Sequence, residues 1–121
     1  MNFDEHKPIY LQISDHIREK VISDEYQEEE RIPSIREFGT LLGVNPNTVM
    51  RSFDYLKSME IIYDKRGVGF FIASGAKKKI KKMYKDEFYE NELPDIIKKI
   101  KILDIDLDEL IKKIETELSN E

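Results

Sequence analysis

Residues 32–59 read IPSIREFGTLLGVNPNTVMRSFDYLKSM and begin with a helix-start signal. Ser34 followed three positions later by Glu37 forms a capping box, which satisfies backbone N–H groups that are free at the start of a helix. A helix is therefore expected from Ser34 to about Leu42. Gly43 then ends this helix, because glycine readily adopts the left-handed conformation found just beyond a helix C-terminus.

A second helix start follows almost at once. Asn45 is favoured as an N-cap and Pro46 at the first helical position, so the next helix is expected over residues 45–59. Apolar residues at helical spacing give each helix an inward side, formed by Phe38, Leu41 and Leu42 in the first and by Val49, Phe53 and Leu56 in the second. Polar side chains follow the opposite side of the second helix: Asn45, Thr48, Arg51, Ser52 and Tyr55.

The flanking residues complete a winged helix-turn-helix. Before this pair, a helix is expected from Pro8, with isoleucine or valine at positions 9, 13, 17 and 21. After it, two β-rich runs enclose the basic, glycine-containing turn at residues 65–69, which predicts a hairpin. The expected fold class is thus mainly α with a small β-hairpin wing.

The remaining residues predict a helical tail. Helices are expected over residues 77–91, again from Pro94, and from an N-cap at Asp106. This segment is too short to enclose a ligand cavity by itself, and its apolar faces need a partner. We therefore expect two domains, a winged helix-turn-helix DNA-binding domain at 1–75 and a helical dimerisation tail at 76–121.

Charge is distributed unevenly along the 121 residues, which carry a formal net charge of −5. Residues 31–74 carry six basic and four acidic side chains, and residues 75–85 carry six lysines and no acid. Residues 1–30 and 86–121 are strongly acidic. A basic centre between acidic ends is compatible with a polyanionic partner, because the distribution of charge matters more than its total.

The polar face of the second helix suits double-stranded DNA. A helix fits the major groove, where Asn pairs with adenine and Arg with guanine through two hydrogen bonds each. The first two turns of this helix carry Asn45, Asn47, Thr48 and Arg51, and Arg36 lies in the first turn of the helix before it. Lys65, Arg66 and Gly67 lie at the hairpin tip, where they are expected to meet the DNA backbone or the minor groove.

These motifs resemble the GntR family of bacterial transcription regulators. The resemblance spans about residues 7–74 and rests on Pro8–Ile13, Ile32–Glu37, Leu42–Val49 and Arg66–Phe71. The Asn-Pro-Asn-Thr-Val-Met form and the short tail look most like the YtrA subfamily of small dimeric repressors. The resemblance implies a homodimer that binds an inverted-repeat operator, with DNA contacts from Ser34, Arg36, Asn45, Asn47, Thr48, Arg51, Arg66 and Gly67.

The chain departs from the family pattern in two places. Many relatives have a Gly-Asp turn where this chain has Glu29-Glu30, so the loop before Ile32 is expected to differ in shape. Many relatives outside the YtrA subfamily carry a basic residue at the position of Pro46. Proline has no group that donates to DNA there, so base preference is expected to shift.

Other functional classes have less support. The chain has no cysteine, and its two histidines, His6 and His16, are poorly spaced for a metal, so we expect no enzyme activity, no metal and no cofactor. A winged helix can also serve as a protein-interaction module, but the outer face of the 45–59 helix is polar, not apolar and aromatic. No run is apolar enough to span a membrane and no signal peptide is evident, so the expected location is cytoplasmic. No residue pattern identifies an effector.

The lysine run at residues 77–82 has two interpretations. It is either a solvated helix start or a segment that follows DNA phosphates beside the wing. Neutralising Lys77, Lys78 and Lys79 would separate them, because each lost phosphate contact lowers the salt dependence of binding.

Overall fold

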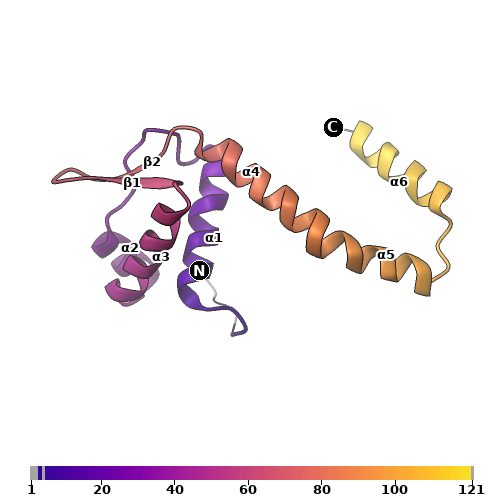
Figure 1. Ribbon diagram of the computed structural model, residues 1–121, viewed down its shortest axis with the longest axis horizontal. Helices are drawn as coiled ribbons and strands as arrows, with labels where there is room; N and C mark the ends of the chain where they lie inside the picture. Colours follow the sequence, from indigo (N-terminus) through magenta and orange to yellow (C-terminus); the bar gives the residue numbers. More distant parts are fainter. Residues whose placement is uncertain (1–2, 4, 121) are drawn as a thin grey trace. The chain divides into compact units, whose positions relative to one another are not determined.

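The computed structural model of the chain describes residue 3 and residues 5–120. The chain divides into two compact units, Met1–Lys82 and Met83–Glu121, which are described separately. The elements of the first unit are α1 (Ile9–Ile22), α2 (Ile35–Leu42), α3 (Pro46–Ser58), β1 (Ile62–Lys65), β2 (Gly69–Ile72) and the beginning of α4 (Ala76–Glu87) (Figure 1). The predicted winged helix-turn-helix with a β-hairpin is confirmed.

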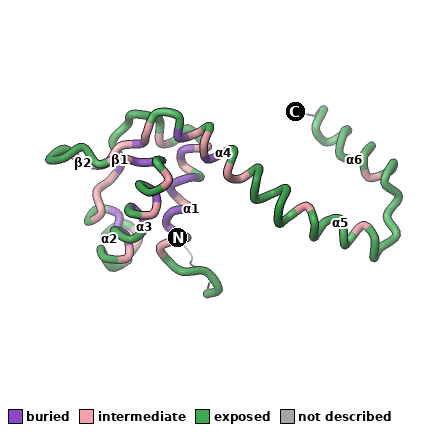
Figure 2. Tube along the Cα trace, in the orientation of Figure 1, coloured by how far each residue is buried: buried purple, intermediate pink, exposed green. Residues whose placement is uncertain are grey.

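The core of the first unit forms around α3, which packs against both α1 and α2. Phe53 is fully buried, and its ring meets Phe38 and Phe70 edge-on at centroid distances of 5.7 and 4.7 Å. Of the predicted apolar positions of α1, Ile13, Ile17 and Val21 are buried, whereas Ile9 at the start of the helix is exposed. Figure 2 shows the buried positions concentrated in these helices and at the base of the hairpin. These side chains supply the apolar burial that stabilises the unit.

The hairpin is antiparallel, with Ile62 opposite Ile72 and Lys65 opposite Gly69. The loop before α2 pairs with β2 in the manner of a short third strand. The N–H of Ile32 donates to the Phe70 carbonyl at 2.9 Å. The loop reaches this position through Glu29, whose φ of 67° lies in the left-handed region. A side chain other than glycine rarely takes this conformation, so the backbone at Glu29 is strained.

A predicted core residue of α2 is also exposed. Leu41 was expected to face inward with Phe38 and Leu42, yet 71% of its surface is accessible. α2 has only eight residues, and its neighbour α3 covers the side that carries Phe38 and Gly39. The prediction for Leu41 is therefore wrong.

In the second unit, the π-helical segment η1 (Phe88–Glu92) continues directly into α5 (Leu93–Ile102), so the helix break expected at residue 91 is wrong. Pro94 has no N–H to donate to the preceding turn, and a π-helical turn accommodates the missing bond without ending the helical path. The predicted start at Asp106 is confirmed: its carboxylate accepts a 3.0 Å bond from the N–H of Asp108 at the start of α6 (Leu107–Ser119).

Apolar side chains of the second unit remain accessible. No residue between 81 and 120 is buried, as the uniformly green and pink trace in Figure 2 shows. None of the helices in the described part of the chain combines the length and apolar character required to cross a lipid bilayer.

Candidate nucleic-acid interface

The first turn of α2 holds two of the predicted contact residues. Ser34 and Glu37 form the complete capping box: the Ser34 Oγ accepts from the Glu37 N–H at 3.1 Å, and the Glu37 carboxylate accepts from the Ser34 N–H at 3.1 Å. This backbone bond from Ser34 lowers the pKa of Glu37. The Ser34 hydroxyl hydrogen remains available, and Arg36 is exposed on the same turn.

The turn between α2 and α3 depends on two glycines. Gly43 ends α2 with a φ of 66°, in the predicted left-handed conformation. Gly39 lies where an added Cβ would be 2.9 Å from the Val44 carbonyl oxygen, so the backbone of the turn leaves no room for a side chain there. The sequence pattern did not indicate this role of Gly39. These glycines fix how α3 projects from α2.

The predicted polar residues at the start of α3 lie on its accessible side. Asn45, Asn47 and Arg51 are exposed and Thr48 is half-buried. The Asn45 Oδ1 caps the helix by accepting from the Asn47 N–H at 2.8 Å. Asn45 therefore keeps its amide N–H groups for an outside acceptor, and Asn47 keeps its whole side-chain amide.

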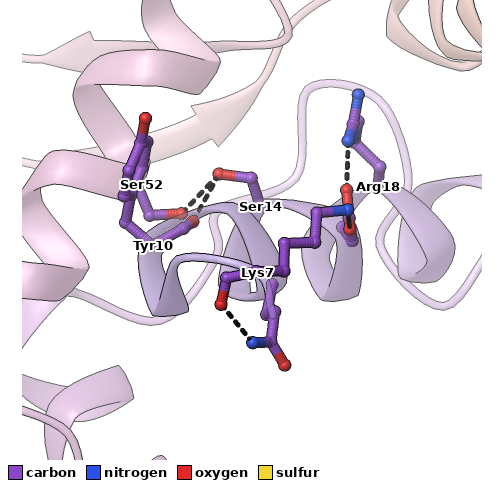
Figure 3. Close-up of polar contacts among 7 residues, drawn as sticks. Lys7, Tyr10, Ser14, Arg18 and Ser52 are labelled. Carbon is purple, nitrogen blue, oxygen red and sulfur yellow. Dashed lines mark hydrogen bonds and ion pairs between the residues drawn. The ribbon is translucent and has the colours of Figure 1, made fainter. Parts of the chain in front are cut away.

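Ser52 is not on this accessible face. It was expected beside Arg51, but it is completely buried, and its Oγ lies 2.7 Å from the Oγ of Ser14 in α1 (Figure 3). A residue one position from the polar face of a helix can belong to either side, and a serine is small enough to be buried against another hydroxyl. The prediction for Ser52 is therefore wrong, and this buried pair ties α1 to α3.

α1 also contributes to the accessible surface, which the sequence analysis did not predict. An open hollow of about 400 Å³ is lined by Pro8, Ile9 and Tyr10 from the start of α1 and by Asn47, Thr48 and Arg51 from α3. The Arg51 Cζ lies 4.1 Å from the centroid of the Tyr10 ring. Nothing in the sequence pattern of α1 indicated this contact, because it joins residues that are 41 positions apart.

The wing residues lie at the tip of the hairpin, which projects beyond the helices in Figure 1. Lys65, Arg66 and Gly67 are exposed, and Gly67 has a φ of 77°. Arg31 supports the hairpin from the neighbouring loop: its Nε donates to the Val68 carbonyl at 3.1 Å. At Gly69, an added Cβ would lie 2.6 Å from this Nε, so Gly69 makes room for Arg31.

Acidic residues pair with Lys77 and Lys79, at the start of the lysine run. Lys77 pairs with Asp24 at 2.8 Å and Lys79 with Glu60 at 3.4 Å. Lys78 is exposed on the same helix. Lys81 is also exposed. Two of the three lysines proposed above for neutralisation thus already have a carboxylate partner.

The carboxylate of Glu28 caps the start of α4. It accepts from the N–H groups of Gly75 at 2.7 Å and Lys77 at 3.3 Å. Glu29, the next residue, accepts a 2.7 Å bond from the hydroxyl of Tyr63, and this bond raises the Tyr63 pKa. The acidic loop therefore binds its own protein and joins β1 to the start of α4.

Comparisons with known proteins agree with this geometry. Residues 9–72 match the family described as bacterial regulatory proteins, gntR family. The HTH-type transcriptional regulator YhcF of Bacillus subtilis is 34% identical over 114 residues, which cover 94% of this chain and 93% of YhcF. The HTH-type transcriptional repressor YtrA of the same organism is 36% identical over 70 residues, 58% of this chain and 54% of YtrA.

A solved structure extends the likeness to nearly the whole chain. It is a GntR-family transcriptional regulator from Bacteroides thetaiotaomicron with 43% sequence identity and a TM-score of 0.79, covering 92% of this chain and 96% of that one. Regulators of this family act by binding DNA and are not enzymes. The chain therefore belongs to the GntR family of bacterial regulatory proteins and is a YtrA-like transcriptional regulator with a winged helix-turn-helix DNA-binding domain.

Proposed function

We propose that this regulator is a repressor that binds an inverted-repeat operator as a homodimer. α3 enters the major groove, and the wing at residues 65–69 meets the adjacent backbone and minor groove. The observation that carries the proposal is the accessible polar start of α3, where Asn47, Thr48 and Arg51 open onto one hollow. Amide, hydroxyl and guanidinium groups are the side chains that read base edges in that groove.

The cations around α3 support the same binding mode. None of the ion pairs within the described residues involves Arg36, Arg51 or Arg66, so their charge is available to phosphates and bases. Ser34 and Asn45 flank the helix starts with free side-chain donors, which suits phosphate contacts. The acidic loop at residues 24–30 is engaged with Tyr63 and α4 and thus helps to shape the protein without taking part in binding.

The tail supports the proposed dimer. Within residues 83–120, large apolar side chains remain accessible, among them Ile97, Ile111 and Ile114 at 41–49%. A second copy of the tail would cover these side chains and place two reading helices about a two-fold axis, which requires an inverted repeat. We retain residues 1–75 and 76–121 as the two domains of this proposal. Light scattering at micromolar concentration tests it, and a monomer would contradict the dimer.

The assignment as a repressor rests on the named function of YtrA, which is similar over 70 residues, or 58% of this chain. A reporter gene placed behind the operator tests it. Lower expression in the presence of the protein is expected. Higher expression would identify an activator.

The experiment for DNA binding is selection of bound duplexes from a random pool. We expect an inverted repeat, because a two-fold dimer reads two half-sites. Arg51→Ala should relax the preference at one base pair of each half-site, whereas the matched surface variant Lys57→Ala, on the same helix, should select the same repeat. If wild type enriches no sequence, DNA reading by α3 is wrong and a protein-interaction role for the winged helix becomes the better account.

A further inference from the structure

The guanidinium of Arg51 rests on an aromatic ring from a different helix. Its Cζ lies 4.1 Å from the centroid of Tyr10, the second residue of α1. None of the ion pairs formed within residues 3 and 5–120 includes Arg51. The Tyr10 ring is thus the contact that sets the direction of this side chain.

Tyr10 is itself held in place. Its ring meets Tyr55 of α3 edge-on, with centroids 6.1 Å apart and an interplanar angle of 88°. Its backbone carbonyl accepts a 2.9 Å bond from the Ser14 hydroxyl, and Ser14 also pairs with the buried Ser52 (Figure 3). The start of α1 is therefore fixed against α3 at the turn that carries Arg51.

A guanidinium stacked on a ring keeps its donors free. The N–H groups of arginine lie in the plane of the guanidinium and point outward, so the face can rest on Tyr10 while the edge binds another group. A free arginine side chain loses rotamer freedom on being fixed, and stacking removes part of that loss before binding. Arg51 lines the same open hollow as Asn47 and Thr48, so the polar groups of all three are accessible to one ligand.

We propose that Tyr10 is a positioning residue for base recognition: it holds Arg51 for a two-bond contact with one guanine in each operator half-site. This inference rests on the proposed function, because it assigns a role within the same interface. It makes α1 part of the specificity machinery, although the expected reading surface comprised only residues of α2, α3 and the wing.

The test compares four proteins: wild type, Tyr10→Leu, Tyr10→Phe and Arg51→Ala. Anisotropy titrations use the selected operator and duplexes that differ from it by one base pair. Tyr10→Leu should lose about two- to fivefold of discrimination per half-site, at the base pair where Arg51→Ala loses it. Tyr10→Phe keeps the ring and should keep the discrimination. Tyr10→Leu/Arg51→Ala should bind no more weakly than Arg51→Ala.

Several results would overturn the inference. A Tyr10→Leu loss that is equal for all duplexes, or that falls at another base pair, would mean that Tyr10 acts through the fold or the DNA backbone. If the losses of affinity caused by Tyr10→Leu and by Arg51→Ala add up in the double variant, Tyr10 also acts independently of Arg51. If Arg51→Ala weakens all duplexes equally and lowers the salt dependence, Arg51 binds a phosphate and the inference is wrong.

Nuclear magnetic resonance of the DNA-free protein separates this inference from the proposed function. The side-chain protons of wild-type Arg51 should show an upfield ring-current shift that Tyr10→Phe retains and Tyr10→Leu removes. If wild type lacks this shift, the positioning role of Tyr10 is wrong even if the protein reads DNA. This result needs only the wild-type protein, so it does not depend on whether a variant folds. If the shift is present but wild type prefers no DNA sequence, the proposed function fails while the stacked pair remains.

Discussion

The buried hydroxyl pair between α1 and α3 predicts an unequal response to two similar substitutions. Ser14 has one hydroxyl hydrogen, which it donates to the Tyr10 carbonyl, so Ser52 must supply the hydrogen of the 2.7 Å bond between the two serines. Ser52→Ala leaves Ser14 with its donor bond and should cost about 1 kcal/mol of unfolding free energy. Ser14→Ala removes the acceptor of a buried donor and should cost more, about 1–3 kcal/mol.

Urea unfolding followed by far-UV circular dichroism, at one fixed protein concentration, measures these costs. The double variant should lose no more than Ser14→Ala does, because no polar group is then left unpaired. Ser58→Ala is the control: Ser58 is exposed, and its hydroxyl bonds only to the Tyr55 carbonyl of its own helix. Its cost should stay within about 0.5 kcal/mol. Equal costs for Ser14→Ala and Ser52→Ala, or additive costs in the double variant, would refute the proton assignment.

Three further predictions concern the wing, the lysines and pH. At Gly69 the backbone φ is 143°, and the Cβ of an alanine would lie 2.6 Å from the Arg31 Nε. Gly69→Ala should therefore lower the free energy of unfolding in urea by about 1–3 kcal/mol. It should also weaken operator binding more than the control Gly67→Ala, because an added Cβ at Gly67 meets no neighbouring atom. If Lys78 and Lys81 follow DNA phosphates, Lys78→Gln/Lys81→Gln should lower the salt slope of binding by up to about two units, whereas an unchanged slope would identify a solvated helix start. Burial lowers the pKa of His16, so the unfolded state binds the proton more readily than the folded state. Stability should therefore fall as the pH drops below about 6.5. Urea midpoints measured across this pH range should change less for His16→Gln than for wild type.

Local signals predicted the helix-turn-helix well because the structure satisfies them within a few residues. The capping box at Ser34, the left-handed Gly43 and the Asn45 cap each depend on neighbouring backbone groups, and each forms as expected. The hairpin followed from two short β-rich runs around a glycine turn, and its register confirms it. The site residues on α3 and the wing are accessible, as expected, and their contacts with DNA stay a prediction.

Most of the differences arise where separate elements pack against each other. Periodicity placed Leu41 inside and Ser52 outside, but the faces that become buried depend on which helix lies alongside, and α1 covers Ser52. The Tyr10–Arg51 stack joins two helices far apart in the sequence, so no local pattern contains it. Pro94 indicated a break, yet a π-helical turn accommodates it. The differences at Leu41, Ser52 and Tyr10 concern packing between elements, whereas the difference at Pro94 is one of local helix geometry.

The most direct test of sequence-specific binding compares two duplexes of equal length and composition, the selected inverted repeat and its scrambled form. Fluorescence anisotropy at physiological salt measures the two dissociation constants for the wild-type protein. The account predicts tighter binding of the inverted repeat by about a thousandfold or more, with a stoichiometry of two chains per duplex. Equal affinity for both duplexes, lost as salt is raised, would contradict it.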